Sequence, residues 1–157
     1  MSAPDVSTAD GMSASRVALT VMRLFRSLEL VDAGLTPQQY RILKLAGAGG
    51  ERSARLAERL AVAKPTLTAT ADGLVAAGYA RRDAEPGDRR VVRLSLTTAG
   101  RDALDRADAA YAGWLDRLLG DLSEADRILI LHSLTVLDTV VQPPRCGGRP
   151  PAVLAAG

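Results

Sequence analysis

The sequence predicts a mainly α-helical chain that carries one small β-hairpin. Three observations predict this fold class. Apolar residues recur at spacings of three and four along most of the chain, which is the period of a helix with one buried face. Two short helical segments are joined by about four residues, as in a helix-turn-helix. A stretch that alternates apolar and charged residues follows and predicts a hairpin, or wing. The expected domain is a winged helix-turn-helix flanked by N- and C-terminal dimerisation helices.

The first expected helix spans about residues 13–31. One face is apolar at helical spacing and comprises Val17, Val21, Leu24, Leu28 and Val31. Further apolar residues lie off this face at Leu19, Met22, Phe25 and Leu30. The helix is therefore apolar over more of its circumference than contact with a single core requires.

The second helix has a strong start signal. Thr36 is the expected N-cap, Pro37 suits the first helical position, and Gln39 can complete a capping box. The helix is expected to run to Ala46 and to end at Gly47, the first of several closely spaced glycines.

The helix-turn-helix follows. Ser53 can cap a short helix over 54–60, and a second helix starts at Pro65 and ends at Gly78, with residues 61–64 as the turn. This second helix is the expected recognition helix.

The wing comes next, where the period changes from helical to alternating. Residues 79–84 form the first expected strand, and 85–88 form a turn. In the second strand the apolar Val92, Leu94 and Leu96 alternate with Arg93, Ser95 and Thr97.

Two more helices complete the domain. Thr97 is expected to cap a long helix, and Ser123 to open the last one with capping-box spacing. The solvent side of the long helix is marked by Asp102, Asp105, Arg106, Asp108 and Asp116. The N-terminal helix and the last helix expose more apolar area than one small core covers. This excess predicts a symmetric homodimer built from segments 13–33 and 101–141; the alternative is that the two helices bury each other.

The composition excludes several classes of site. The chain has 157 residues, one His and one Cys, which suits a single domain and leaves no internal disulfide or multi-histidine metal site. Catalysis by a base would depend on His132, for which a core or interface place in its apolar helix is favoured. No glycine-rich phosphate loop lies between a strand and a helix. We therefore expect no enzyme activity, no cofactor and no metal.

The two ends of the chain are expected to be disordered. Residues 1–12 have neither the basic nor the apolar stretch of a secretory signal, and residues 142–157 are rich in Pro and Gly. Cys146, in this tail, is expected to be an incidental exposed thiol. Fully apolar runs reach only four or five residues, far short of the roughly 20 that span a bilayer. We expect a cytoplasmic protein with no membrane partner.

The net charge of +2 conceals a strong asymmetry. Residues 36–100 hold eleven basic and six acidic residues, a charge of +5, and the rest of the chain carries −3. The basic excess coincides with the helix-turn-helix and the wing. Such a local excess is the electrostatic footprint of a face that binds duplex DNA.

The recognition helix and the wing supply the candidate contacts. The helix N-terminus favours phosphate through its free N–H groups and its dipole, threonines can meet phosphate or base edges, and wing arginines can follow the backbone or enter a minor groove. The candidate DNA-binding residues are Ser53, Lys64, Pro65, Thr66, Thr68, Thr70, Asp88, Arg89, Arg90 and Arg93.

Several motifs converge on one family. The segments 35–40 (LTPQQY), 56–60 (LAERL), 64–66 (KPT), 88–90 (DRR) and 94–100 (LSLTTAG) resemble MarR-type transcriptional regulators. The resemblance covers residues 13–141 and is most specific at the wing and the helix start after it. It implies a homodimer, a repressor role, a pseudo-palindromic double-stranded DNA operator and release by a small aromatic or phenolic effector.

The resemblance also assigns roles residue by residue. Lys64, Pro65, Thr66 and Thr68 match the start of the recognition helix. Arg90 matches the wing arginine of the family. Asp88 matches the acid that holds the wing by pairing with an arginine.

Three alanines depart from the family pattern. Ala61 stands where glycine is frequent in the turn, Ala63 where Ser or Thr often caps the recognition helix, and Ala69 where arginine is frequent. The recognition helix then has no Arg, Asn or Gln for bidentate base contacts. We expect wing contacts and DNA shape to carry much of the specificity.

Two other functions and the effector stay open at this stage. The chain could be a winged-helix protein-interaction module without DNA binding, or a thiol-based oxidation sensor that uses Cys146 between subunits. Phe25, Tyr40, Tyr111 and Trp114 are candidate effector-pocket linings, although ordinary core packing is favoured for each. The five aromatic residues give no support for a flat aromatic effector.

Overall fold

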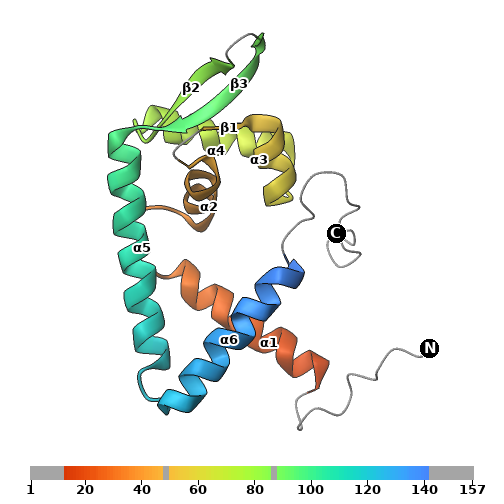
Figure 1. Ribbon diagram of the computed structural model, residues 1–157, viewed down its shortest axis with the longest axis vertical. Coiled ribbons are helices and arrows are strands. Elements are labelled where there is room, and N and C mark those ends of the chain that lie inside the picture. The colour runs from red at the N-terminus through yellow and green to blue at the C-terminus, as the bar shows by residue number, and fades with distance from the viewer. Residues whose placement is uncertain (1–12, 48–49, 86–87, 142–157) are drawn as a thin grey trace, which may run out of the picture.

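The computed structural model describes residues 13–47, 50–85 and 88–141 (Figure 1). A mainly helical chain with one small antiparallel sheet confirms the predicted fold class. The end segments 1–12 and 142–157, which were expected to be disordered, lie outside the described residues. The elements in chain order are α1 (Ala14–Glu29), α2 (Pro37–Ala46), β1 (Glu51–Arg52), α3 (Ser53–Leu60), α4 (Lys64–Ala76), β2 (Ala80–Glu85), β3 (Asp88–Leu96), α5 (Thr98–Leu119) and α6 (Glu124–Val141).

Hydroxyl caps start three of the helices where the sequence places them. The Thr36 hydroxyl accepts from the Gln39 N–H, and the Gln39 side chain accepts from the Thr36 N–H, which confirms the capping box of α2. Thr97 caps α5, and the Ser123 hydroxyl accepts from the Asp126 N–H at the start of α6. These local signals are strong because each hydroxyl satisfies an N–H that otherwise has no partner within the helix.

The prediction that Ser53 caps the next helix is wrong. Ser53 is the first residue of α3, Arg52 holds the N-cap position, and no side chain caps the helix. The cause is β1, which the sequence analysis did not predict: Glu51 and Arg52 pair with Leu94 and Arg93 of β3. The chain therefore passes directly from strand to helix at Arg52.

The sheet has the order β1-β3-β2, with both pairings antiparallel. The predicted hairpin is confirmed, although β2 starts one residue later than expected and extends through Glu85. The tip residues 86–87 lie outside the described ranges. Because β3 is central, it connects the wing to the start of α3.

The core lies between the three-stranded sheet, α2, α3, α4 and the first half of α5. Its fully buried large side chains are Ile42, Leu43, Leu56, Leu74 and Leu94. Figure 1 shows α5 running from the sheet at the top to the opposite end of the molecule, where α1 and α6 lie. The winged-helix unit therefore has a core of its own.

In contrast, α1 and α6 bury no residue. Their exposed apolar side chains include Leu19, Val21, Met22 and Phe25 on α1, and Ile128, Leu129, Val136, Leu137, Val140 and Val141 on α6. The alternative that the two helices bury each other is thus not what the structure shows. No helix in the described ranges combines the length and apolarity needed to cross a bilayer.

Candidate nucleic-acid interface

The helix α4 presents a polar side outward from the core. It is anchored by the buried Leu67, Ala71 and Leu74, whereas Lys64, Thr66 and Thr68 are exposed. It begins at Lys64, one residue before the expected start, with Pro65 in its first turn. The proline fits there because its missing N–H would have no helical partner in any case.

The threonine hydroxyls are partly occupied within α4. Thr68 donates to the Lys64 carbonyl and Thr70 to the Thr66 carbonyl, each at 2.9 Å. Thr70 is half-buried, and Thr66 and Thr68 are exposed. Because the Thr68 hydroxyl proton is directed at the Lys64 carbonyl, donating to DNA requires this hydroxyl to rotate.

The turn before α4 carries the two departures noted in the sequence. Ala61 ends α3 in the left-handed conformation with φ +52°, which a side chain with a Cβ disfavours. Ala63 holds the N-cap of α4 and supplies no side-chain hydrogen bond, as expected. The first N–H groups of α4 therefore lack a capping oxygen.

The wing is tied to the recognition helix by an ion pair. Arg82 on β2 lies 2.6 Å from Asp72 on α4, and Arg81 pairs with Asp83 at 3.0 Å. Hydrogen bonds from Arg81 and then Ser95 hold the pKa of Asp83 below its ordinary value. The Arg82–Asp72 pair orients β2 against α4, whereas the Arg81–Asp83 pair lies within β2.

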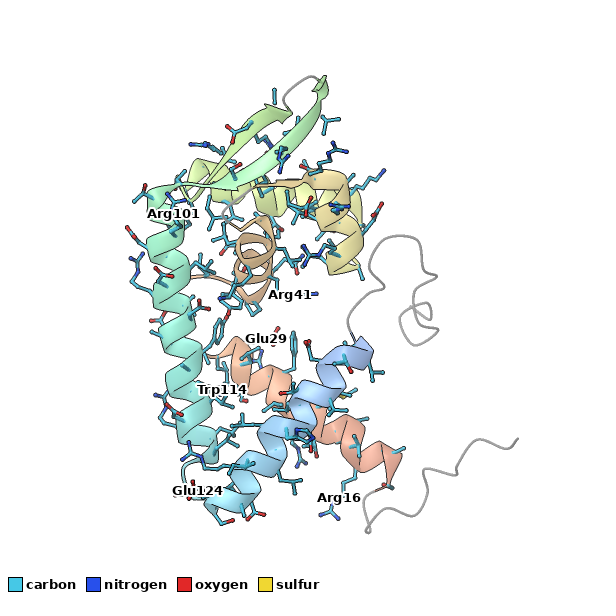
Figure 2. The ribbon with its side chains drawn as sticks, in the orientation of Figure 1. Arg16, Glu29, Arg41, Arg101, Trp114 and Glu124 are labelled. Atoms are coloured by element: carbon cyan, nitrogen blue, oxygen red, sulfur yellow. The ribbon has the colours of Figure 1, made fainter. Side chains whose placement is uncertain are left out.

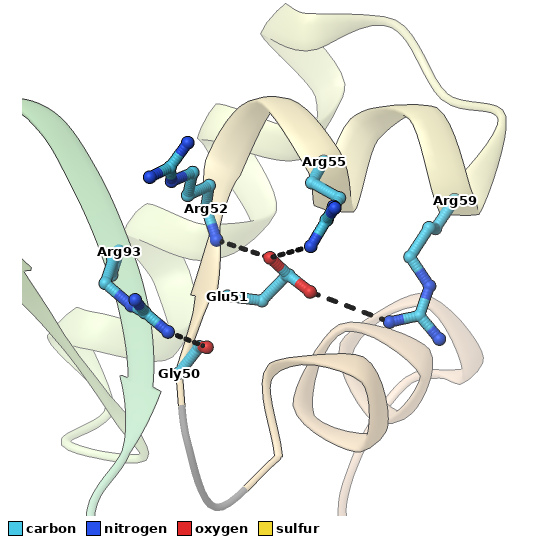
Figure 3. Close-up of polar contacts among 6 residues, drawn as sticks. All are labelled: Gly50, Glu51, Arg52, Arg55, Arg59 and Arg93. Atoms are coloured by element: carbon cyan, nitrogen blue, oxygen red, sulfur yellow. Dashed lines mark hydrogen bonds and ion pairs between the residues drawn. The ribbon is translucent and has the colours of Figure 1, made fainter. Parts of the chain in front are cut away.

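The candidate wing residues fall into two groups. Arg93 is half-buried, and its guanidinium donates to the Gly50 carbonyl at 2.7 Å (Figure 3). This contact gives Arg93 a structural role at the junction with β1. Asp88, Arg89 and Arg90 lie on the backbone of β3, but their side chains lie outside the described part, so the expected pairing of Asp88 with an arginine stays a prediction.

Glu51 is a site residue that the sequence analysis missed. Figure 3 shows its carboxylate turned toward two arginines of α3: Oε1 lies 3.9 Å from Arg55 and Oε2 3.8 Å from Arg59. Oε1 also accepts from the Arg52 N–H at 3.0 Å. The Glu51 side chain is only 17% exposed. The i,i+4 spacing of Glu51 and Arg55 was the available signal, but it does not reveal the second arginine.

A second polar cluster joins α2 to α5. Asp108 was expected on the solvent side of its helix; instead it accepts from the Tyr40 hydroxyl and from Lys44 Nζ, each at 2.6 Å. Tyr40 in turn meets the Tyr111 ring edge-on, with centroids 4.8 Å apart. Helical periodicity could not reveal this, because the position of α2 is set by the tertiary fold.

The cluster shifts the proton affinities of its members. Burial, and then the hydrogen bond to Asp108, raises the pKa of Tyr40 well above its ordinary value. Burial alone would raise the pKa of Asp108, but the hydrogen bonds from Lys44 and Tyr40 outweigh it and the pKa falls. At neutral pH the cluster therefore holds an ionised Asp108 and a neutral Tyr40.

A cleft of about 610 Å³ separates the end of α1 from α5. It is lined by Leu30, Val31 and Asp32 on the α1 side and by Gly113, Trp114 and Arg117 on α5, together with three small residues, Ser27, Ala109 and Ala110. Figure 2 labels Trp114 on α5 beside the upper end of α1.

The four aromatic candidates for a pocket lining lie in different surroundings. Of these, Trp114 lines the cleft. Tyr40 and Tyr111 pack against the core, which is the ordinary role that the sequence favoured. Phe25 is exposed on α1.

His132 and Cys146 were the two residues that the sequence offered for chemistry. His132 is exposed on α6, so it does not lie in the core of the single chain, and the alternative place in an interface stays a prediction. Cys146 lies outside the described residues. Within the described ranges, no group of three His, Cys, Asp or Glu side chains could hold a metal ion.

Comparison with known proteins adds the family. Residues 33–91 match the family model described as MarR family. The repressor MdtR from Bacillus subtilis is 29% identical over 125 residues, which cover 75% of this chain and 81% of that protein. The YusO protein from Bacillus subtilis has a crystal structure that is 27% identical, with a TM-score of 0.63 over 84% of this chain and 99% of that one. By these matches the chain is similar to MarR-family winged-helix transcriptional regulators.

The chain also shares the fold of MarR itself. The apo crystal structure of E. coli MarR superposes with a TM-score of 0.69 over 80% of this chain and 96% of that one, at 22% identity. The matches to the family model and to the curated relatives, rather than the shared fold, are those of DNA-binding transcriptional regulators. The segment that matches the family model, 33–91, contains α4 and most of the wing.

Proposed function

We propose that this MarR-family regulator acts as a homodimer that binds a two-part DNA operator and represses transcription. The observation that carries the proposal is the state of α1 and α6, which bury no residue in the single chain. Apolar faces of this extent are covered by a partner in stable proteins, and a second copy of the same chain is the commonest partner.

The proposed roles of the parts of the chain follow from the position of the core. Residues 36–100 form the DNA-binding part, and segments 13–33 and 101–141 form the dimer arms. In each copy α4 enters a major groove and the wing follows the adjacent backbone. The proposed contacts come from Ser53 of α3, from Lys64, Pro65, Thr66, Thr68 and Thr70 of α4, and from Asp88, Arg89, Arg90 and Arg93 of β3.

Repression and release are the finer parts of the proposal. The relative MdtR is named a transcriptional repressor, and a dimer bound over a promoter excludes the polymerase. The cleft of about 610 Å³ beside Trp114 lies within the range of small-molecule sites, roughly 300–1,000 Å³. An effector bound there would contact both α1 and α5 and so favour one arrangement of the dimer arms. A DNA partner implies a cytoplasmic location.

The wing assignment is tested with Arg90→Ala on an operator selected from random duplex DNA by the wild-type chain. We expect weaker binding and a salt dependence of log Kd flattened by about one counterion per lost phosphate contact. The matched control is Arg106→Ala, which removes an exposed positive charge from α5. Unchanged affinity and slope in Arg90→Ala would contradict the assignment. No binding of wild type to any duplex at low salt would instead favour the protein-interaction module.

A further inference from the structure

We propose that Asp108 is a positioning residue for DNA binding: by joining α5 to α2, it sets the distance at which two copies of the chain present α4 to the duplex. The inference rests on the proposed dimer. It deepens that proposal by assigning half-site spacing to a side chain outside the proposed contact set.

Asp108 lies close to the point where α5 leaves the core, with Ala110 and Tyr111 the last α5 side chains packed against it. Ala103 and Ala107 are buried against the winged-helix unit, and the next buried residue along α5 is Leu119. At 1.5 Å per residue, α5 continues for roughly 16 Å beyond Asp108. A tilt of about 10° at this point displaces the far end by roughly 3 Å, close to the rise of one base pair, about 3.4 Å. Fixing the tilt of α5 at Asp108 therefore fixes the distance between the two α4 helices of the proposed dimer.

The geometry at Asp108 suits that control. Both carboxylate oxygens are used: Tyr40 donates to Oδ1 and Lys44 to Oδ2, each at 2.6 Å. The two donors are one turn apart on α2, so the two bonds together resist both sliding and rotation of α5. A single apolar contact resists neither, because dispersion has little directionality.

The rest of the cluster holds the two donors in place. The Tyr111 ring, one turn further along α5, packs edge-on against Tyr40 at 4.8 Å and 67°. Lys44 Nζ lies 5.7 Å from the centre of the Tyr40 ring, within the range of a cation–π contact. The cluster is therefore a rigid link between the DNA-binding part and the dimer arm.

Operators of altered spacing test the inference. The wild-type chain first selects a two-part operator from random duplex DNA, and the spacer is then shortened or lengthened by one base pair. We expect wild type to bind its selected spacing at least about tenfold more tightly than either altered spacing. In Asp108→Asn the anionic acceptor of Lys44 is lost, and we expect this ratio to fall below about threefold. Affinity for a single half-site should stay within about twofold of wild type.

Two further variants complete the design. Tyr40→Phe keeps the ring packed against Tyr111 but removes the hydroxyl donor, so it should lower the spacing ratio in the same direction without a cavity. Asp105→Asn removes the same charge from an exposed position one turn earlier on α5 and should keep the full ratio.

The outcomes separate the possibilities. A full spacing ratio in both Asp108→Asn and Tyr40→Phe overturns the inference. An equal loss of affinity for half-site and full operator also overturns it, because Asp108 then supports only the folding of the DNA-binding part. A wild-type chain that selects no two-part operator overturns the proposed function and this inference together, which distinguishes that failure from the other two.

Discussion

Gly100 lies buried in the first turn of α5, where the backbone passes directly over the loop before β2. A Cβ at this position would overlap the carbonyl oxygen of Tyr79, and that carbonyl also accepts from the Thr97 N–H. The glycine is therefore required by close approach of two backbones rather than by its φ angle. This explains in physical terms why a glycine follows the Thr97 cap in the motif at residues 94–100.

We expect Gly100→Ala to lower the free energy of unfolding by about 1–3 kcal/mol, because the Tyr79 backbone cannot move aside as a flexible side chain can. The measurement is urea denaturation followed by circular dichroism. Gly73→Ala is the matched control: nothing lies within 4 Å of its added Cβ, so helix propensity should raise stability by about 0.5–1 kcal/mol. Equal effects of the two substitutions would contradict the close approach.

Ala61 gives the opposite prediction. Its φ of +52° places an exposed Cβ in the left-handed region, at a cost of roughly 1–2 kcal/mol. Ala61→Gly should raise the free energy of unfolding by up to about 1 kcal/mol, because glycine in the unfolded chain offsets part of the gain. Thermal denaturation measures it. A lower melting temperature in Ala61→Gly would show that the turn is not strained.

Among the elements, those with local signals were predictable from sequence. The starts of α2, α5 and α6 depend on a hydroxyl and an N–H three residues later, so a short stretch of sequence contains the whole interaction. β1 could not be predicted, because two residues form a strand only when β3 lies beside them. For the same reason Asp108 was missed, because its partners Tyr40 and Lys44 come from α2, which the tertiary fold brings beside α5. Glu51 was missed although its partners lie within eight residues, because sequence spacing alone does not show that its carboxylate is shared between Arg55 and Arg59.

The link between α2 and α5 predicts a pH dependence. The pKa of Asp108 is lower in the folded chain than its ordinary value of 3.8, so its contribution to stability is present above that value and is lost as pH falls through the lowered pKa. Asp108→Asn should therefore be less stable than wild type near pH 7 by about 1 kcal/mol, an amount limited by screening of a partly exposed pair. Denaturation at stepwise lower pH should show this difference shrinking below about pH 4.

The control for this pH dependence is Asp105→Asn, which removes a carboxylate from the exposed side of α5. A difference between Asp108→Asn and wild type that persists unchanged to pH 2 would rule out an ionised Asp108 as its source.

For the whole molecule, the dimer arms predict the oligomeric state. Wild type should sediment at twice the chain mass at micromolar concentration. Leu129→Glu combined with Leu137→Glu places two charges on the exposed apolar surface of α6. Because neither side chain belongs to the core, this variant should sediment as single folded chains. Thr98→Glu with Ala99→Glu, on the exposed first turn of α5, should remain paired. A single-chain mass for wild type would contradict the proposed dimer.

The uncovered surfaces of α1 and α6 have a consequence for dosage in the cell. If only paired chains span both half-sites, the amount of active regulator rises with the square of the chain concentration while single chains predominate. Promoter occupancy then responds more steeply than linearly to synthesis of the protein. A modest change in copy number would then produce a larger change in promoter occupancy, in addition to any response to an effector.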